Sequence, residues 1–191
     1  NFNKKINYNK FLHATKSYIH RGPDQIKFLK RENFAINFRR LKIIDLSNNA
    51  SQPFEDKYNK ITLIFNGEIY NYVELRSELI KYKYFFNTKS DTEVILKSYL
   101  KWDLEFIYKL RGMFSIIIFD GRKNKVFFFR DRLGQKPLFY SFYEDGIILS
   151  SEIKDIVSIK KKIQPNPKAI QKYLFRGWCD DNSDTFFKGI K

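Results

Sequence analysis

Cysteine and histidine are scarce in this sequence. Cys179 is the one cysteine among 191 residues, so no internal disulfide can form, which fits a reducing cytoplasm. The two histidines, His13 and His20, have no cysteine partner and no short ligand spacing between them. We therefore expect no metal site.

Long apolar runs are missing too. Runs such as SIIIFD are far shorter than the roughly 18 apolar residues that span a bilayer. The opening NFNKKINYNK is too polar for a signal peptide. We therefore expect a cytoplasmic protein with no membrane partner.

Acidic residues are outnumbered by basic ones, 21 against 36, and the formal net charge is +15. Such a charge attracts nucleic acid without specificity, with an affinity that falls steeply as salt rises. The basic residues are spread along the chain, with one short run at 160–162, and no RNA-binding motif with stacking aromatics is visible. We expect a solvated, lysine-rich surface and no specific nucleic-acid partner.

The chain does have enough apolar and aromatic residues, 43% and 18%, for one domain with a sizeable core. Apolar spacing predicts helices over residues 8–19, 71–79, 91–102, 151–159 and 167–174. Strands are predicted over 34–38 and 41–46, and hairpins are predicted around 121–124 and 144–145. Helices combined with hairpins predict an α+β fold with antiparallel sheets.

Two polar stretches carry local signals of their own. The pair Asn66-Gly67 is typical of a hairpin turn, here between strands 61–65 and 68–70. Asn71 resembles a helix cap, and Ser90 with Glu93 is typical of a capping box. The chemical alternative for Asn66-Gly67 is an oxyanion site, because a side-chain N–H and a glycine N–H can bind a developing negative charge.

Other candidate residues have a structural and a functional interpretation. Asp91 either complements the dipole of its helix or holds an ammonium group. Arg40 is either a surface charge or a clamp for a carboxylate. The stretches HRGPD and RDR are either structural turns and ion pairs or parts of a site.

Taken together, these stretches are more specific than any one of them. HRGPD, FRRLKIIDLS, FNGEIYNYVELR, SDTEVIL, LRGMFSIIIFD, RDRLGQKPLFY and SSEIKDI occur in that order. The chain thereby resembles, from His20 to the final FFKGIK, the glutaminase domain of glutamine-dependent asparagine synthetases. These are class II glutamine amidotransferases of the N-terminal nucleophile hydrolase family.

The resemblance implies a four-layer αββα sandwich of antiparallel sheets that lacks its first strand. It implies a glutaminase domain over residues 1–176 and the start of a linker over 177–191. HRGPD and RDRLGQKPLFY would be scaffolding loops. The implied glutamine-binding residues are Arg40 for the α-carboxylate, Asp91 for the α-ammonium, Asn66 and Gly67 as the oxyanion hole, and Glu68 and Ile44 in the same pocket.

In this family the nucleophile is an N-terminal cysteine, whose own α-amino group, with a pKa of about 7.7–8.0, serves as the base. Residue 1 here is Asn1, and Cys179 lies in the polar tail. The resemblance therefore implies a truncated chain, because the other site residues are all present. The 191 residues by themselves are predicted to be inactive, and a degenerate domain that binds glutamine without hydrolysing it is the alternative.

The intact protein would hydrolyse glutamine, pass ammonia through an internal channel and amidate an aspartyl-adenylate. ATP and Mg²⁺ would belong to a synthetase domain that is the partner of this one, since no Ser-Gly-Gly-x-Asp-Ser loop occurs here. No cofactor is expected in the glutaminase domain, and a homodimer stays open. The alternatives are an amidotransferase acting on a sugar or another carboxylate, and a non-catalytic glutamine-binding module.

Overall fold

The structure is a computed structural model that describes residues 11–12, 20–40, 47–143, 146–160, 162–179 and 182–191. The chain divides into two compact units. The central unit comprises residues 19–29 and 36–136, and the terminal unit comprises 1–18, 30–35 and 137–191. No helix in the described ranges is long and apolar enough to cross a membrane. The predicted division at residue 176 stays a prediction.

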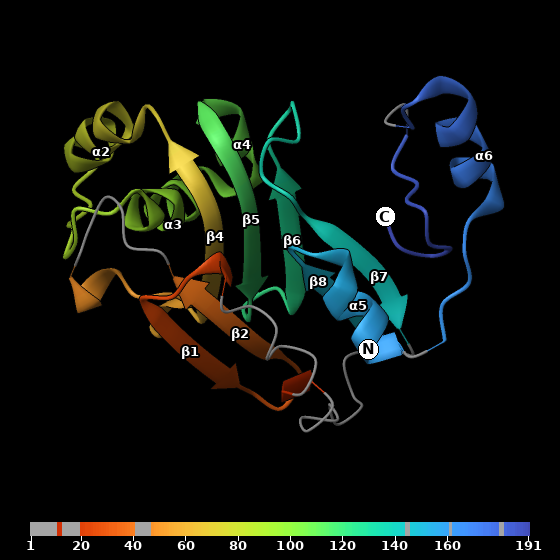
Figure 1. Ribbon diagram of the computed structural model, residues 1–191. Helices are drawn as coiled ribbons and strands as arrows, with labels where there is room; N and C mark the ends of the chain where they lie inside the picture. Colours follow the sequence, from red (N-terminus) through yellow and green to blue (C-terminus); the bar gives the residue numbers. More distant parts are fainter. Residues whose placement is uncertain (1–10, 13–19, 41–46, 144–145, 161, 180–181) are drawn as a thin grey trace. The chain divides into compact units, whose positions relative to one another are not determined.

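The central unit is built on a four-stranded antiparallel sheet of order β3-β4-β5-β6 (Figure 1). Its strands are β3 Phe54–Asp56, β4 Ile61–Ile69, β5 Gly112–Asp120 and β6 Lys125–Arg130. The helices are α2 Tyr72–Lys81, α3 Asp91–Trp102 and α4 Phe106–Lys109, with short 3-10 turns at Asn48–Ala50 and Asp103–Glu105. A separate two-stranded sheet pairs β1 Gln25–Lys30 with β2 Ala35–Arg40.

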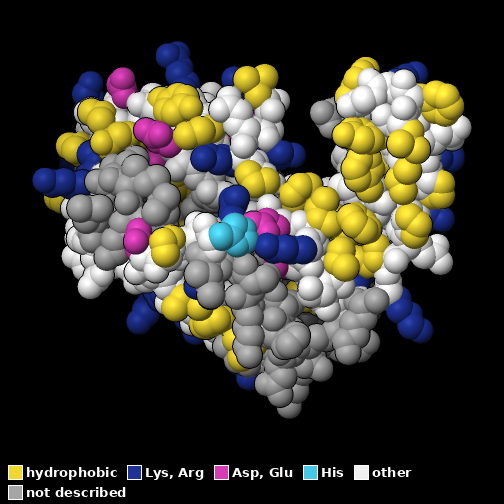
Figure 2. Space-filling view, in the orientation of Figure 1, with side chains coloured by type: hydrophobic (Ala, Val, Ile, Leu, Met, Phe, Trp, Pro, Cys, Tyr) yellow, Lys and Arg dark blue, Asp and Glu magenta, His cyan; other side chains and the backbone are white. Residues whose placement is uncertain are grey.

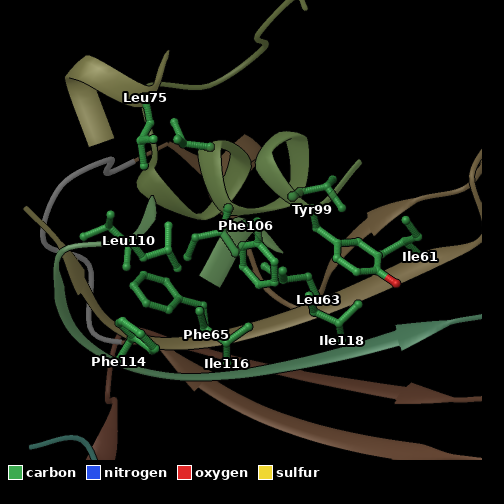
Figure 3. Packing of buried hydrophobic residues seen from close by; sticks show 14 of the residues in the cluster. Ile61, Leu63, Phe65, Leu75, Tyr99, Phe106, Leu110, Phe114, Ile116 and Ile118 are labelled. Carbon is green, nitrogen blue, oxygen red and sulfur yellow. The ribbon is translucent and has the colours of Figure 1, made fainter. Parts of the chain in front are cut away.

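One face of β4 and β5 forms the core together with the helices. Leu63, Phe65 and Ile116 extend from the sheet toward Tyr99 and Phe106 (Figure 3). All five side chains are at most 4% exposed, and each buried side chain of this size contributes about 1.5–3 kcal/mol. Because successive side chains of a strand point to opposite faces, the residues of β4 between these core positions lie on the other face of the sheet.

The hairpin predicted at Asn66-Gly67 is wrong. Strand β4 runs without a turn through both residues, and it pairs with β5 along its whole length, from Ile61 opposite Asp120 to Ile69 opposite Gly112. The pairing with β5 satisfies main-chain groups of β4 along this length, and the helices bury the apolar face of the strand. This tertiary gain outweighs the local turn preference of the two residues.

Both predicted capping arrangements are partly wrong. Helix α2 begins after Asn71, but the Asn71 side chain makes no capping hydrogen bond. At α3, the Ser90 hydroxyl does accept from Thr92 N at 3.0 Å. The Glu93 carboxylate instead accepts from Thr88 N, at 2.7 Å, and so anchors the preceding loop.

The Asn71 side chain joins two other elements instead. Its Nδ2 donates to Lys109 O, and Arg111 N donates to its Oδ1, both at 2.9 Å. The amide therefore fastens the start of α2 to the segment that enters β5.

The terminal unit contains the hairpin of β7 Phe139–Tyr143 and β8 Gly146–Ser150, followed by α5 Ile153–Lys160 and α6 Pro167–Arg176. Helix α6 is capped by Asn166, begins with proline and ends at Gly177, whose φ is 74°. The hairpin at 121–124, the pairing of the strands that flank 144–145, both of these helices and the α+β class are confirmed. The predicted strand 41–46 lies outside the described residues, as does the predicted helix 8–19 apart from residues 11–12.

Candidate active site

Asn66 lies on the face of β4 opposite the core, directly across from Ser115 on β5. Ser115 is 5% exposed. The Asn66 Nδ2 atom is buried, and it has no hydrogen-bond partner among the residues that the structure describes. A buried donor without an acceptor is costly, so a ligand oxygen at this position would be stabilised.

Gly67, the next residue, is required by the close approach of two strands. Its φ is 155°, and a Cβ atom added there would lie 2.1 Å from Met113 O. Only a residue without a side chain fits so close to β5. The sequence predicted a glycine that lets substrate approach; the observed close neighbour is the main chain of β5.

Asp91 is the first residue of α3 and is 4% exposed. Its Oδ2 accepts from Ile69 N at 3.2 Å, which joins the start of α3 to the end of β4. Burial raises the pKa of Asp91, and it outweighs the hydrogen bonds from Ile69, Thr92 and Ser90, which lower it. A cation bound at this carboxylate would offset the burial.

Arg40 is the last residue of β2 and is 7% exposed. Its Nη1 donates to Ser47 O at 3.0 Å, which ties the end of β2 to the loop 47–53. The HRGPD stretch packs against the main chain here: a Cβ atom on Gly22 would lie 2.7 Å from Arg40 N, and Asp24 N donates to Arg40 O at 3.2 Å. This stretch therefore scaffolds the backbone of Arg40.

The loop 47–53 connects Arg40 to the other candidate residues through Gln52, which the sequence did not identify. Gln52 hydrogen-bonds to Phe65, just before Asn66, and to Thr92, just after Asp91. The sequence around Gln52 does not indicate this role, because its hydrogen-bond partners Phe65 and Thr92 are distant along the chain. The loop thus joins the neighbourhoods of the predicted site residues.

Two predicted site residues remain. Glu68 is exposed on β4, opposite Met113. Ile44 lies outside the described residues. Asn66 and Gly67 thus lie on β4 shortly before Ile69, where Asp91 contacts the strand, and one loop links Arg40 to the same strand.

The RDRLGQK loop supports β5 behind Gly67. The Asp131 carboxylate accepts hydrogen bonds from four main-chain N–H groups, at 2.9–3.2 Å, from Phe114, Leu133, Gln135 and Lys136. Phe114 is the residue of β5 opposite Gly67. These main-chain bonds, and not the ion pair considered from the sequence, organise the loop.

Three other kinds of site were considered: a metal centre, a reactive thiol and a basic surface patch. No group of three or more His, Cys, Asp or Glu residues in the part of the chain that the structure describes could hold a metal ion. Cys179 follows α6 and is a free, half-buried thiol. On the face shown in Figure 2, Lys and Arg side chains are scattered and do not form one continuous patch.

The sequence matches the family described as "Glutamine amidotransferase domain" over residues 1–191. It is 41% identical over 156 residues to asparagine synthetase (glutamine-hydrolyzing) 1 of Bacillus subtilis, an alignment that covers 82% of this chain and 24% of that protein. It is 33% identical over 171 residues to amidase chyE of Penicillium rubens, over 90% of this chain and 25% of that protein. The chain thus spans about a quarter of the length of both relatives.

A solved structure of glutamine phosphoribosylpyrophosphate amidotransferase from B. subtilis, complexed with ADP and GMP, has a similar fold. The TM-score is 0.59 at 20% identity, over 68% of this chain and 30% of that one. This likeness shows the fold alone, an α+β sandwich of antiparallel sheets as predicted. The family match and the identity to the relatives agree with the ordered motifs: the chain belongs to the glutamine amidotransferase domain family and is homologous to part of the glutamine-hydrolysing asparagine synthetases.

Proposed function

We propose that this chain binds L-glutamine and forms the glutaminase part of a glutamine-hydrolysing asparagine synthetase. The observation that carries the proposal is the buried Asn66 Nδ2, which has no hydrogen-bond partner in the described ranges of the chain. Hydrolysis of an amide passes through a tetrahedral intermediate whose oxygen is negative. A donor held ready for that oxygen lowers the barrier by stabilising the transition state more than the ground state.

The proposed oxyanion hole consists of Asn66 Nδ2 and the N–H of Gly67. Along β4, Gly67 lies between two anchored residues: Phe65, whose N–H is held by Gln52, and Ile69, whose N–H is held by Asp91. Anchors on both sides restrict the movement of this segment. A preorganised donor pair is the arrangement that electrostatic catalysis requires.

The charges of glutamine itself are assigned to Asp91 and Arg40. The buried Asp91 carboxylate, with its raised pKa, would gain from a neighbouring α-ammonium group. Arg40, held at the end of β2, presents the planar guanidinium that suits an α-carboxylate. Glu68 and Ile44 are proposed to line the same pocket.

The nucleophile proposed for this chemistry is an N-terminal cysteine. We expect the 191 residues by themselves to bind glutamine without releasing glutamate, because their single cysteine, Cys179, lies after α6 in the polar tail. The glutaminase chemistry proposed here uses no cofactor. In the whole protein, ammonia would be passed to a synthetase domain that uses ATP and Mg²⁺ to activate aspartate, in the cytoplasm.

The test is calorimetry with L-glutamine on the 191-residue chain, followed by a glutamate-release assay on the chain extended by Cys-Gly-Ile at its start. We expect binding in both and release only in the extended chain. Asn66→Ala should lower the rate of release by about 10²–10³ with little change in glutamine affinity.

Asn59→Ala is the matched control. The Asn59 amide donates to Asp56 at 2.9 Å in the turn before β4, so its removal should leave both affinity and rate unchanged. Absence of glutamine binding to the folded wild-type chain would contradict the proposal. An extended chain that binds glutamine and does not turn over would instead favour the non-catalytic binding module.

A second candidate differs only in the acceptor of the ammonia. It is favoured by the relative named as an amidase, which is 33% identical, and the acceptor would then be a carboxylate or sugar other than aspartate. An ammonia-consumption assay on the longer protein, with aspartate compared against other carboxylates, separates the two. Aspartate-dependent consumption of ATP supports the synthetase assignment.

A further inference from the structure

The Gln52 side chain occupies the place of a strand residue beside β4. It is 7% exposed. Its Oε1 accepts from Phe65 N at 2.6 Å, and its Nε2 donates to Phe65 O at 3.0 Å. Because the N–H can only donate and the carbonyl can only accept, these two bonds fix the orientation of the amide.

The register explains why a side chain is used at this point. Phe54 pairs with Leu63 in the antiparallel β3–β4 ladder, so the continued ladder would bring residue 52 opposite Phe65. Strand β3 begins only at Phe54, so the main chain of residue 52 does not extend the ladder to Phe65. The Gln52 amide supplies the donor and acceptor that the ladder would otherwise lack, at the residue just before Asn66.

The same amide also reaches α3. Gln52 Nε2 donates to Thr92 Oγ1 at 3.4 Å, and Thr92 follows Asp91. One buried side chain therefore contacts the neighbours of both the proposed oxyanion donor and the proposed ammonium-binding carboxylate.

We propose that Gln52 is a positioning residue for glutamine: it sets the Asn66-Gly67 segment relative to Asp91. The inference rests on the function proposed above. Gln52 does not itself contact the substrate. Without it, the end of β4 and the start of α3 would still be joined through Asp91 and Ile69, but the strand would no longer be anchored before Asn66.

The test compares three variants of the 191-residue chain by calorimetry with L-glutamine and by amide hydrogen exchange without ligand. Gln52→Glu keeps the acceptor for Phe65 N–H and loses both donated bonds. Thr92→Val removes only the contact to α3, adds no charge and keeps the main-chain bond to Ser90. Gln25→Glu is the control, because Gln25 Nε2 donates to Ser51 Oγ at 3.0 Å beside Gln52, and no hydrogen bond joins Gln25 to β4 in the described residues.

We expect Gln52→Glu to raise the dissociation constant for glutamine about tenfold, because it loses the hydrogen bonds donated to Phe65 O and to Thr92 Oγ1. Thr92→Val should raise it about threefold, and Gln25→Glu should leave it unchanged. Exchange of the Asn66 amide should accelerate in Gln52→Glu, because the Phe65 carbonyl of the same peptide loses its partner. Exchange of the Phe65 amide, which keeps its acceptor, and of the Leu63 amide should stay as in the wild type. A merely structural role would lower the melting temperature of the folded variant without moving the dissociation constant.

A folded Gln52→Glu or Thr92→Val that binds glutamine like the wild type would overturn the inference and leave the proposed function standing. If Gln52→Glu does not fold, Thr92→Val alone decides the question. A wild-type chain that does not bind glutamine would overturn the proposed function first and this inference with it, and that result is recognised without any variant.

Discussion

Asp91 and Asp131 are both buried carboxylates, but their surroundings shift their pKa values in opposite directions. Burial raises the pKa of Asp91. At Asp131, burial also acts upward, but hydrogen bonds from Lys136, Gln135 and Phe114 outweigh it and lower the pKa. We interpret the first residue as one kept ready for a ligand and the second as one that supports its loop.

Replacing Asp91 by asparagine should therefore stabilise the protein and abolish its ligand affinity. A carboxylate with a raised pKa adds stability below its unfolded value of 3.8 and loses that contribution as pH rises through the folded pKa. At pH 7, Asp91→Asn should melt at a temperature a few degrees higher, an advantage that disappears below about pH 4. Calorimetry should show no glutamine binding.

Asp131→Asn is the matched comparison, with the opposite sign. Its carboxylate has a lowered pKa and therefore stabilises the fold above the unfolded value. The variant should lose about 1–3 kcal/mol at pH 7, as measured by urea unfolding. Equal effects of the two substitutions on stability would contradict the different roles.

At the scale of the element, strand β4 carries the proposed oxyanion donors and is itself held by its neighbours. Its core face is buried by α3 and α4, Gln52 and Asp91 hold its main chain, and β5 lies so close that Gly67 has no room for a side chain. The strand is thus held on several sides along the stretch where the proposed donors lie. A side chain at residue 67 should therefore disturb the pairing of β4 with β5.

Gly67→Ala is expected to destabilise the protein by more than the roughly 1 kcal/mol typical of point substitutions, because its Cβ would meet Met113 O at 2.1 Å. Gly146→Ala is the control, since the closest atom there is Tyr143 O at 3.8 Å, an ordinary contact. Urea unfolding of both variants measures the difference. Similar stabilities would mean that β5 moves aside at little cost.

At the scale of the whole molecule, the excess of basic residues makes buried carboxylates important for stability in acid. The formal net charge is already +15 at pH 7 and rises as carboxylates are protonated, which increases repulsion within the folded chain. Asp120 is fully buried between β5 and the turn that follows it. Burial raises its pKa, but hydrogen bonds from Arg122, at 2.7 Å, and from Tyr99, also at 2.7 Å, outweigh this effect and lower it to about 2.

Stability should consequently fall as pH drops from 4 toward 2, since a carboxylate with a lowered pKa stabilises the fold above its unfolded value and loses this contribution through its folded one. Asp120→Asn should be less stable than the wild type at pH 7, by about 1.5–3 kcal/mol. The difference should shrink between pH 4 and pH 2. Urea unfolding of both proteins at several pH values measures it, and a difference that stays constant with pH would exclude a role for the Asp120 charge.

The sequence by itself determined the features whose causes lie within a few neighbouring residues. The hairpin at 121–124 and the start of α6 were predicted because turn and cap signals act locally. The order of the motifs determined the family. It also named Asn66 and Asp91 as candidates before their surroundings were known.

Only the tertiary structure decided where polar side chains find their partners. Asn66-Gly67 forms no turn because β5, distant in sequence, pairs through it. Glu93 anchors a loop, and Gln52 completes the edge of β4. In each case the local preference is worth about a kilocalorie per mole, and burial of a whole strand against a distant partner exceeds it.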